Sequence, residues 1–174
     1  MLPDGTVSGA DDSMREATII FELAPAKFVP YSVYFFLENI VHDFNHGAFH
    51  RNAGHVLQAM FRKHEGADSH HTNFAWQEYS HEFPHKQYTL GFAGRPSGSS
   101  AIYISTLDNT DNHGPASQGS KTEADATLGK LASPESIQIV KRMLKQKGGK
   151  PAGFVTDPHE HIRIMGLRLM EKYD

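Results

Sequence analysis

Arg51 is the residue of this chain with the clearest chemical potential. It follows Phe49 and His50, and Gln58 comes seven residues after it. An arginine stays charged and presents a rigid fork of hydrogen-bond donors, so a fixed guanidinium can act on a bound group without covalent chemistry. An arginine at the start of a strand is usually a surface residue, and a lone glutamine carries no signal. The surrounding elements therefore decide whether Arg51 and Gln58 belong to one site.

Short strands are predicted on both sides of this pair. In residues 18–23 apolar side chains alternate with other residues, as in a half-buried strand. In residues 55–61 Gln58 lies on one face, and Leu57, Ala59 and Phe61 share the other. The further predicted strands are residues 88–93, 101–106, 126–131, 154–155 and 161–169.

Two helices are predicted. Pro30 suits a first helical turn, where its missing N–H needs no partner, and apolar residues then recur at helical spacing as far as Phe44. Ser133-Pro134-Glu135 combines an N-cap serine with a proline and an acid in the first turn. Gly148-Gly149 is expected to end this second helix. Many short strands with only two helices indicate a closed barrel or a sandwich with helical caps.

The order of these features resembles the cyclophilins, a family of peptidyl-prolyl cis-trans isomerases. The resemblance rests on Phe49-His50-Arg51 with Gln58, followed by Leu90-Gly91-Phe92-Ala93-Gly94 and the strand at residues 101–106. It spans about residues 18–169 and implies a mainly β fold, a closed eight-stranded antiparallel barrel capped by two α-helices. Residues 16–174 would form this domain, after a loose lead-in at residues 1–15.

The resemblance implies isomerisation of X–Pro bonds in proline-containing peptides or proteins, with no cofactor and no metal. Rotation about such a bond faces a barrier of about 18–20 kcal/mol, because the nitrogen lone pair is delocalised into the carbonyl. A guanidinium that donates to the prolyl nitrogen favours the twisted state, in which this delocalisation is lost. By resemblance Arg51 would be this catalyst, and Gln58 would hold the substrate backbone and brace the arginine.

The resemblance also implies a set of substrate-binding residues. They are His55, Val56, Phe92, Ala101, Tyr103 and Leu128. Val56, Tyr103 and Leu128 would surround the proline ring, and Phe92 would contact substrate through its backbone. His55 stands where the family has a pocket phenylalanine, and Ala101 stands where it has a second glutamine.

Other positions depart from the family pattern and keep a second hypothesis open. The turn between Arg51 and Gly54 is one residue shorter than in the family and lacks its usual proline. The pocket tryptophan has no counterpart in residues 108–123, and Asp125 stands where a histidine is usual. The alternative is therefore a catalytically impaired cyclophilin-fold module that binds a protein partner, as part of a larger assembly.

Composition excludes several other classes. The chain of 174 residues has a net charge of −3 and no cysteine, so disulfides, thiolate nucleophiles and cysteine zinc sites are excluded. No basic footprint indicates nucleic-acid binding, and no apolar run reaches the roughly 18 residues of a membrane span. The first residues lack the basic and then apolar pattern of a signal peptide, and nothing in the sequence assigns a compartment.

The twelve histidines are candidate metal ligands. The segment from His81 to His85 spells H-E-x-x-H, but Pro84 opposes the helix that a zinc protease needs there. His42, His46 and His50 are four residues apart and would share one face of a continuous helix, although solvated surface histidines are the simpler interpretation. Ser99 and Ser100 lack the strand-turn-helix setting of a hydrolase nucleophile.

Overall fold

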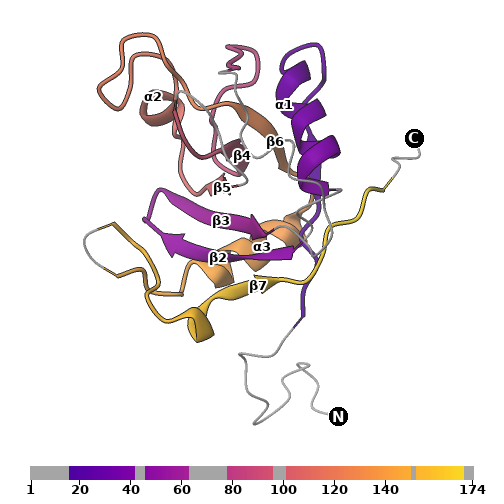
Figure 1. The fold of residues 1–174 in the computed structure, drawn as a ribbon, viewed down its shortest axis with the longest axis vertical. Coiled ribbons are helices and arrows are strands. Elements are labelled where there is room, and N and C mark those ends of the chain that lie inside the picture. Colours follow the sequence, from indigo (N-terminus) through magenta and orange to yellow (C-terminus); the bar gives the residue numbers. More distant parts are fainter. Residues whose placement is uncertain (1–15, 42–45, 63–77, 96–100, 150–151, 171–174) are drawn as a thin grey trace.

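The computed structural model describes residues 16–41, 46–62, 78–95, 101–149 and 152–170. These residues form one curled sheet with helices beside it (Figure 1). The strands are β1 (Phe21–Leu23), β2 (His46–Asn52), β3 (Val56–Arg62), β4 (Thr89–Phe92), β5 (Ala101–Ser105), β6 (Thr127–Leu131) and β7 (Ile162–Ile164). All neighbours are antiparallel, in the order β1-β6-β4-β5-β3-β2-β7.

The described sheet differs from the expected barrel at its edges. It has seven strands rather than eight, and its order leaves β1 and β7 at the two edges. Both edge strands have only three residues, and residues 165–170 after β7 belong to no strand. The mainly β, antiparallel class is therefore confirmed, and the sheet in the described ranges is a half-barrel rather than a closed barrel.

The first predicted helix begins at the expected proline. α1 (Pro30–Phe35) continues directly as the π-helix η2 (Phe36–Val41). The carboxylate of Glu78, a residue distant in sequence, accepts hydrogen bonds from the backbone N–H groups of Tyr31 and Ser32, at 3.1 and 2.6 Å. These bonds satisfy two of the free donors at the start of the helix. Phe44, the last predicted position of the apolar stripe, lies outside the described residues.

The second predicted helix begins as expected but ends earlier. α3 (Pro134–Met143) is capped by Ser133, whose hydroxyl accepts a backbone N–H of the first turn at 3.1 Å. The helix ends before Gly148 because the side-chain amide of Asn52 donates to the carbonyls of Leu144 and Gln146, at 3.2 and 2.7 Å. Both carbonyls therefore accept hydrogen bonds from the last residue of β2 instead of from a further turn of the helix.

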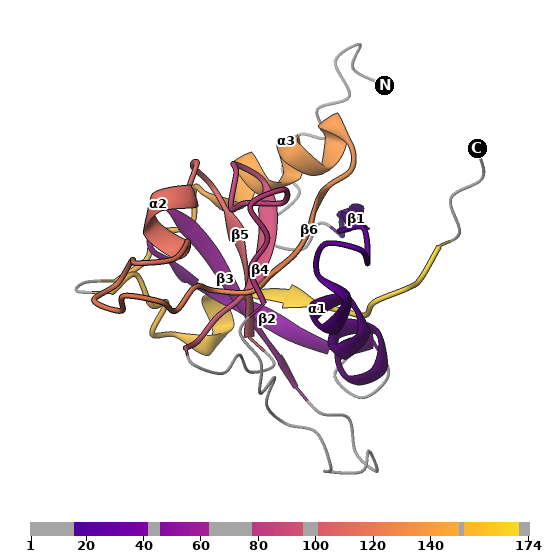
Figure 2. The same cartoon turned by 90° about the horizontal axis from the view of Figure 1, so that it is seen from above.

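Two shorter helices lie in segments for which the sequence predicted neither a helix nor a strand. They are α2 (Thr110–His113) and the 3-10 helix η3 (Pro158–Glu160). α2 lies on the opposite side of the molecule from α1 (Figure 2). No helix in the described ranges is both long and apolar enough to cross a membrane.

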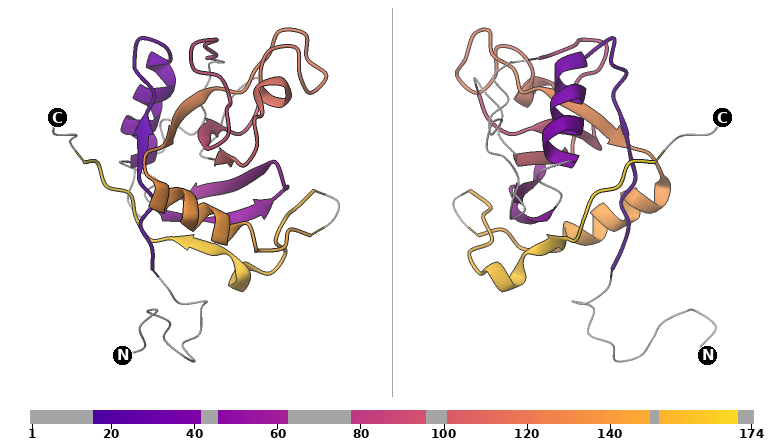
Figure 3. Two further views of the ribbon diagram at one scale, coloured as in Figure 1. Left: turned by 180° about the vertical axis from the view of Figure 1, so that it is seen from behind. Right: turned by 45° about the vertical axis from the view of Figure 1, so that its right-hand side comes forward.

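The core lies against one face of the sheet. Leu57, Ala59 and Phe61 of β3 all point into it, as the alternation predicted. Buried residues of η2 and α3, among them Ile40 and Val140, complete the core, and Figure 3 shows α1 and α3 beside different parts of the curled sheet. The opposite face of β3, which carries Gln58, is thus left for the groove described below.

An extra residue in β2 brings Arg51 to the same face as Gln58. Phe49 pairs with Ala59, but Arg51 pairs with Gln58, so the register shifts by one residue at His50. A β-bulge of this kind redirects the side chains that follow it. Gln58 pairs in turn with Tyr103 on β5, so the three residues form a row across three neighbouring strands.

Gly91 extends this row on β4, where it pairs with Tyr103. A Cβ at position 91 would lie 2.6 Å from the Tyr103 hydroxyl oxygen and 2.7 Å from the adjacent ring carbon. The glycine therefore leaves the space that the tyrosine ring occupies.

We predict that Gly91→Ala lowers the free energy of unfolding by about 1–3 kcal/mol, because the added methyl group overpacks against the ring. Urea denaturation measures the change. Gly166→Ala is the control, since a Cβ there meets nothing within 4 Å, and it should change stability by less than about 0.5 kcal/mol. Equal stability of the two variants would contradict the tight packing at Gly91.

Candidate functional site

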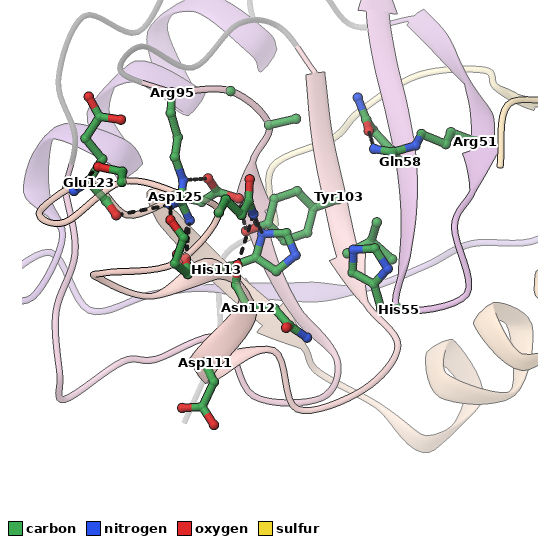
Figure 4. Close-up of a pocket in the computed structure, with 16 residues that line it drawn as sticks. Arg51, His55, Gln58, Arg95, Tyr103, Asp111, Asn112, His113, Glu123 and Asp125 are labelled. Atoms are coloured by element: carbon green, nitrogen blue, oxygen red, sulfur yellow. Dashed lines mark hydrogen bonds and ion pairs between the residues drawn. The ribbon is translucent and has the colours of Figure 1, made fainter. Parts of the chain in front are cut away.

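The row of residues across β2, β3 and β5 lies along one groove. Arg51, Gln58 and Tyr103 all line a groove of about 990 Å³ (Figure 4). The opposite wall comes from α2 and the segment after it, through residues such as His113 and Glu123. The long polar segment at residues 108–123 therefore forms part of the site.

The guanidinium of Arg51 is held on two sides. Its Nε donates to the carbonyl of Ala152 at 2.8 Å, and its Nη1 donates to Oε1 of Gln58 at 2.8 Å. The ring of Phe154 lies 5.2 Å from the guanidinium carbon, within cation–π range. Nη2 has no hydrogen bond within the described residues, so both of its N–H groups are available to a ligand. The contact expected between Arg51 and Gln58 is present.

Five of the eight residues predicted for the site line the groove. They are Arg51, His55, Val56, Gln58 and Tyr103. The other three, Phe92, Ala101 and Leu128, do not line it and are buried. Phe92 and Leu128 belong to the hydrophobic core, and the N–H of Phe92 already donates to the Ala126 carbonyl at 2.9 Å. Val56 and Tyr103, which line the groove, are themselves only 2% exposed, so the substrate-binding role of all of these residues stays a prediction.

His55 lies in the groove as a partly buried side chain. Its Nδ1 is 3.2 Å from the Ala53 carbonyl, and its ring stacks on His113 with centroids 5.5 Å apart. Burial lowers the pKa of His55, and the His113 and Arg51 charges act in the same direction. A neutral imidazole therefore stands where the resemblance expects an aromatic pocket residue.

A buried polar network forms the wall of the groove next to Tyr103. Arg95 donates from Nε to Oδ1 of Asp125 at 2.6 Å, and its other two nitrogens donate to the Ser117 and Glu123 carbonyls, the His113 carbonyl and the Ser117 hydroxyl. Every guanidinium nitrogen of Arg95 is thus used. Burial alone would raise the pKa of Asp125, but the hydrogen bonds from His113 and Arg95 outweigh burial and lower it.

Tyr103 and His85 extend this network beneath the groove. The Tyr103 hydroxyl lies 3.1 Å from both Oδ2 of Asp125 and Nδ1 of His85. Nε2 of His85 lies 2.9 Å from the Asp125 carbonyl. Burial and the Asp125 charge raise the pKa of Tyr103 well above its usual value, and burial lowers the pKa of His85 from 6.5 to about 4. Tyr103 and His85 are therefore neutral near pH 7.

The sequence offered only a weak signal for this network. Asp125 departs from the histidine usual in the family, but nothing in the sequence links it to Arg95 or His113. The H-E-x-x-H pattern is the one sequence signal at His85. These residues come from four separate segments, so only the folded chain brings them together.

The structure also bears on the other histidine patterns. Residues 81–85 form a turn rather than a helix, as Pro84 predicted. His46 and His50 belong to β2, not to a helix, and His42 lies outside the described residues, as do Ser99 and Ser100. Within the described ranges, no group of three or more His, Asp or Glu side chains could hold a metal ion.

Comparison with known proteins identifies the fold. No protein-family model and no curated protein matches the chain. It is similar to the crystal structure of a cyclophilin-type peptidyl-prolyl cis-trans isomerase from Cryptosporidium parvum in the presence of the dipeptide Ala-Pro, with a TM-score of 0.60, 15% identity, and coverage of 87% of this chain and 92% of that chain. For a second structure of that isomerase the values are 0.56, 17%, 84% and 86%. The chain therefore has a cyclophilin-like fold, which confirms the resemblance at the level of the fold.

The buried histidine beneath the groove predicts a pH dependence of stability. Between pH 6.5 and about 4 the unfolded chain binds a proton at His85 that the folded chain does not, so the free energy of unfolding rises with pH across this window. At about 1.4 kcal/mol per pKa unit, His85 should remove about 3 kcal/mol of stability on going from pH 7.5 to pH 4. Urea denaturation at several pH values measures the slope.

The variant His85→Gln keeps a neutral side chain and should flatten this dependence. His159→Gln, at an exposed position, should keep the wild-type slope. The lowered pKa of Asp125 acts at lower pH, since that carboxylate loses its contribution only as the pH falls below about 4. An unchanged slope in His85→Gln would show that His85 is not the group responsible.

Proposed function

We propose that residues 16–174 act as a cyclophilin-like peptidyl-prolyl cis-trans isomerase on X–Pro bonds of proline-containing peptides or proteins. The observation that carries this proposal is the fixed guanidinium of Arg51 on a groove that also contains His55, Val56 and Tyr103. The cyclophilin-like fold supports it, and so does the Ala-Pro dipeptide present with the similar isomerase.

Arg51 would act on the prolyl nitrogen of a bound peptide. As the X–Pro bond twists, the nitrogen lone pair becomes a hydrogen-bond acceptor, and Nη2 of Arg51 would donate to it. Because Ala152 and Gln58 hold the guanidinium before substrate binds, little reorganisation is required in the twisted state. Gln58 would position Arg51 and contact the substrate backbone. The reaction breaks no covalent bond and calls for no cofactor.

The proline ring would lie against Val56 and the ring faces of Tyr103 and His55. Tyr103 is held in place by hydrogen bonds at its hydroxyl, so its ring forms a fixed floor. The His55 side chain has one hydrogen bond within the described residues, to the Ala53 carbonyl, and its ring stacks on His113. This arrangement would bind an X–Pro segment between the guanidinium and the polar wall.

The polar network favours a second candidate function, a partner-binding module with impaired catalysis. The groove wall contains Asp125, Arg95 and His113, which are charged or polar, whereas a proline ring is bound best by apolar surface. In this function the groove would hold a proline-containing segment of a protein partner, as part of a larger assembly, without accelerating rotation.

Substitution of Arg51 tests the isomerase proposal. We predict that Arg51→Ala lowers kcat/KM by about 10²-fold, the loss typical when one preorganised donor is removed. Arg51→Lys keeps the charge but loses the planar fork and should also be impaired. NMR exchange spectroscopy on a short Ala-Pro peptide measures the isomerisation rate directly. Arg163→Ala is the matched control, because Arg163 is exposed on β7 and outside the groove.

Two outcomes would contradict the isomerase proposal. Wild-type turnover in Arg51→Ala would exclude the mechanism through the guanidinium. Binding of the peptide by the wild-type protein without any enhanced exchange would favour the module function instead, and calorimetry on the same peptide supplies that measurement.

A further inference from the structure

The Arg51 guanidinium takes its orientation from two contacts of different origin. Gln58, which accepts from Nη1, lies on the neighbouring strand β3 and shares the geometry of the sheet (Figure 4). The Ala152 carbonyl, which accepts from Nε at 2.8 Å, belongs to the stretch of chain after α3 and lies in no helix or strand. One hydrogen bond fixes a point of the guanidinium, whereas two on different nitrogens fix its plane. The position of Ala152 therefore decides where Nη2 points.

Asn52 holds the stretch that contains Ala152 at two places. Before Ala152, the side-chain Nδ2 of Asn52 donates to the carbonyls of Leu144 and Gln146, at 3.2 and 2.7 Å. After Ala152, the backbone N–H of Asn52 donates to the carbonyl of Gly153 at 2.8 Å. The residue of β2 that follows the arginine thus fixes the chain on both sides of the carbonyl that orients the guanidinium.

The contacts of the Asn52 side chain require an amide. Its Oδ1 accepts the backbone N–H of Gly54 at 3.1 Å, while the two hydrogens of Nδ2 serve the two carbonyls after α3. An aspartate could supply the acceptor, but it has no hydrogen to donate at pH 7. Its second oxygen would instead face two carbonyl oxygens, so this exchange of one atom would push the chain after α3 away from β2.

Close backbone packing makes this stretch sensitive to Asn52. A Cβ at Gly148 or at Gly153 would collide with the Asn52 carbonyl oxygen. Gly153 also has a φ of +81°, which favours glycine, and its N–H donates to the Gly149 carbonyl at 2.6 Å. The chain after α3 is therefore packed directly on the Asn52 backbone, and a displacement there is passed on to the neighbouring Ala152.

We propose that Asn52 is a positioning residue for Arg51: it places the Ala152 carbonyl, and this carbonyl sets the direction of the guanidinium. Asn52 does not line the groove of about 990 Å³, so it acts through Ala152 and not on a ligand in that groove. The inference rests on the proposed function for its effect on catalysis. It goes beyond that function by making the end of α3 a part of the machinery that aims the arginine.

Substitution of Asn52 by aspartate tests the kinetic consequence. Asn52→Asp keeps the acceptor for Gly54 but removes both donors. It should lower kcat for a short Ala-Pro peptide by at least about 10-fold, because a small misplacement of a catalytic group is costly. KM should stay within about twofold, since the lining of the groove is unchanged and the guanidinium acts in the twisted state. NMR exchange spectroscopy at several peptide concentrations separates kcat from KM.

Asn39 supplies the matched control. Its Nδ2 also donates to a backbone carbonyl, that of Phe35 at 3.1 Å, and it lies in η2, outside the groove. Asn39→Asp removes a comparable contact at a distance from Arg51, so it should lower stability and leave kcat at the wild-type value. An equal loss of kcat in the two variants would overturn the positioning role, because it would follow from stability alone.

The Nε–H hydrogen of Arg51 reports the orientation of the guanidinium without reference to activity. Its NMR resonance is assigned by its absence from Arg51→Lys, and in the wild-type protein the bond to Ala152 should slow its exchange with water. In Asn52→Asp this exchange should be about 5-fold faster or more, which corresponds to the loss of one hydrogen bond of about 1 kcal/mol. In Asn39→Asp it should keep the wild-type rate.

The outcomes separate the positioning role from the proposed function. Wild-type kcat or an unchanged Nε–H exchange rate in Asn52→Asp would overturn the positioning role. Faster exchange in Asn52→Asp, together with a wild-type protein that does not accelerate X–Pro rotation, would support the positioning of Arg51 and overturn the isomerase function. Should Asn52→Asp not fold, Asn52→Ser decides in the same way, with smaller changes, because its hydroxyl can still donate to one carbonyl.

Discussion

The single extra residue at His50 in β2 is the constraint on which the groove depends. Side chains alternate between the faces of a strand, so Arg51, two residues after the core residue Phe49, would otherwise point into the core. A charged guanidinium in that core would be costly. The bulge turns Arg51 to the face of Gln58 instead. Without the bulge, strand alternation would bury Arg51. With it, Arg51 becomes the main polar group of the site.

The opposite wall depends on a different interaction, the burial of the Asp125 carboxylate. Arg95 neutralises it, and His113 and Tyr103 complete its hydrogen bonds. Because Arg95 also binds three backbone carbonyls from α2 and the segment after it, the ion pair fixes the path of an otherwise irregular stretch of chain. A fully paired buried charge of this kind gives the groove a rigid wall, but a polar one.

The cyclophilin-like fold is kept at 15–17% identity to a similar isomerase. The fold depends on the strand order and on buried alternating residues such as Leu57 and Ile104, which tolerate many apolar substitutions. The arginine and its brace lie on the sheet and share its geometry. The other wall lies on a connecting segment, where sequence is freer to vary and where a different ligand preference can arise.

The sequence by itself determined the features that depend on local pattern. Capping and alternation predicted the helix starts at Pro30 and Ser133 and the buried face of β3, because both act between near neighbours. The contact between Arg51 and Gln58 was expected only from the resemblance to the cyclophilins. Only the tertiary structure decided the bulge at His50, the burial of Phe92 and Leu128 away from the groove, and the meeting of Arg95, His113 and Asp125. Strand register and contacts between distant segments set these, and neither is encoded in the spacing of nearby residues.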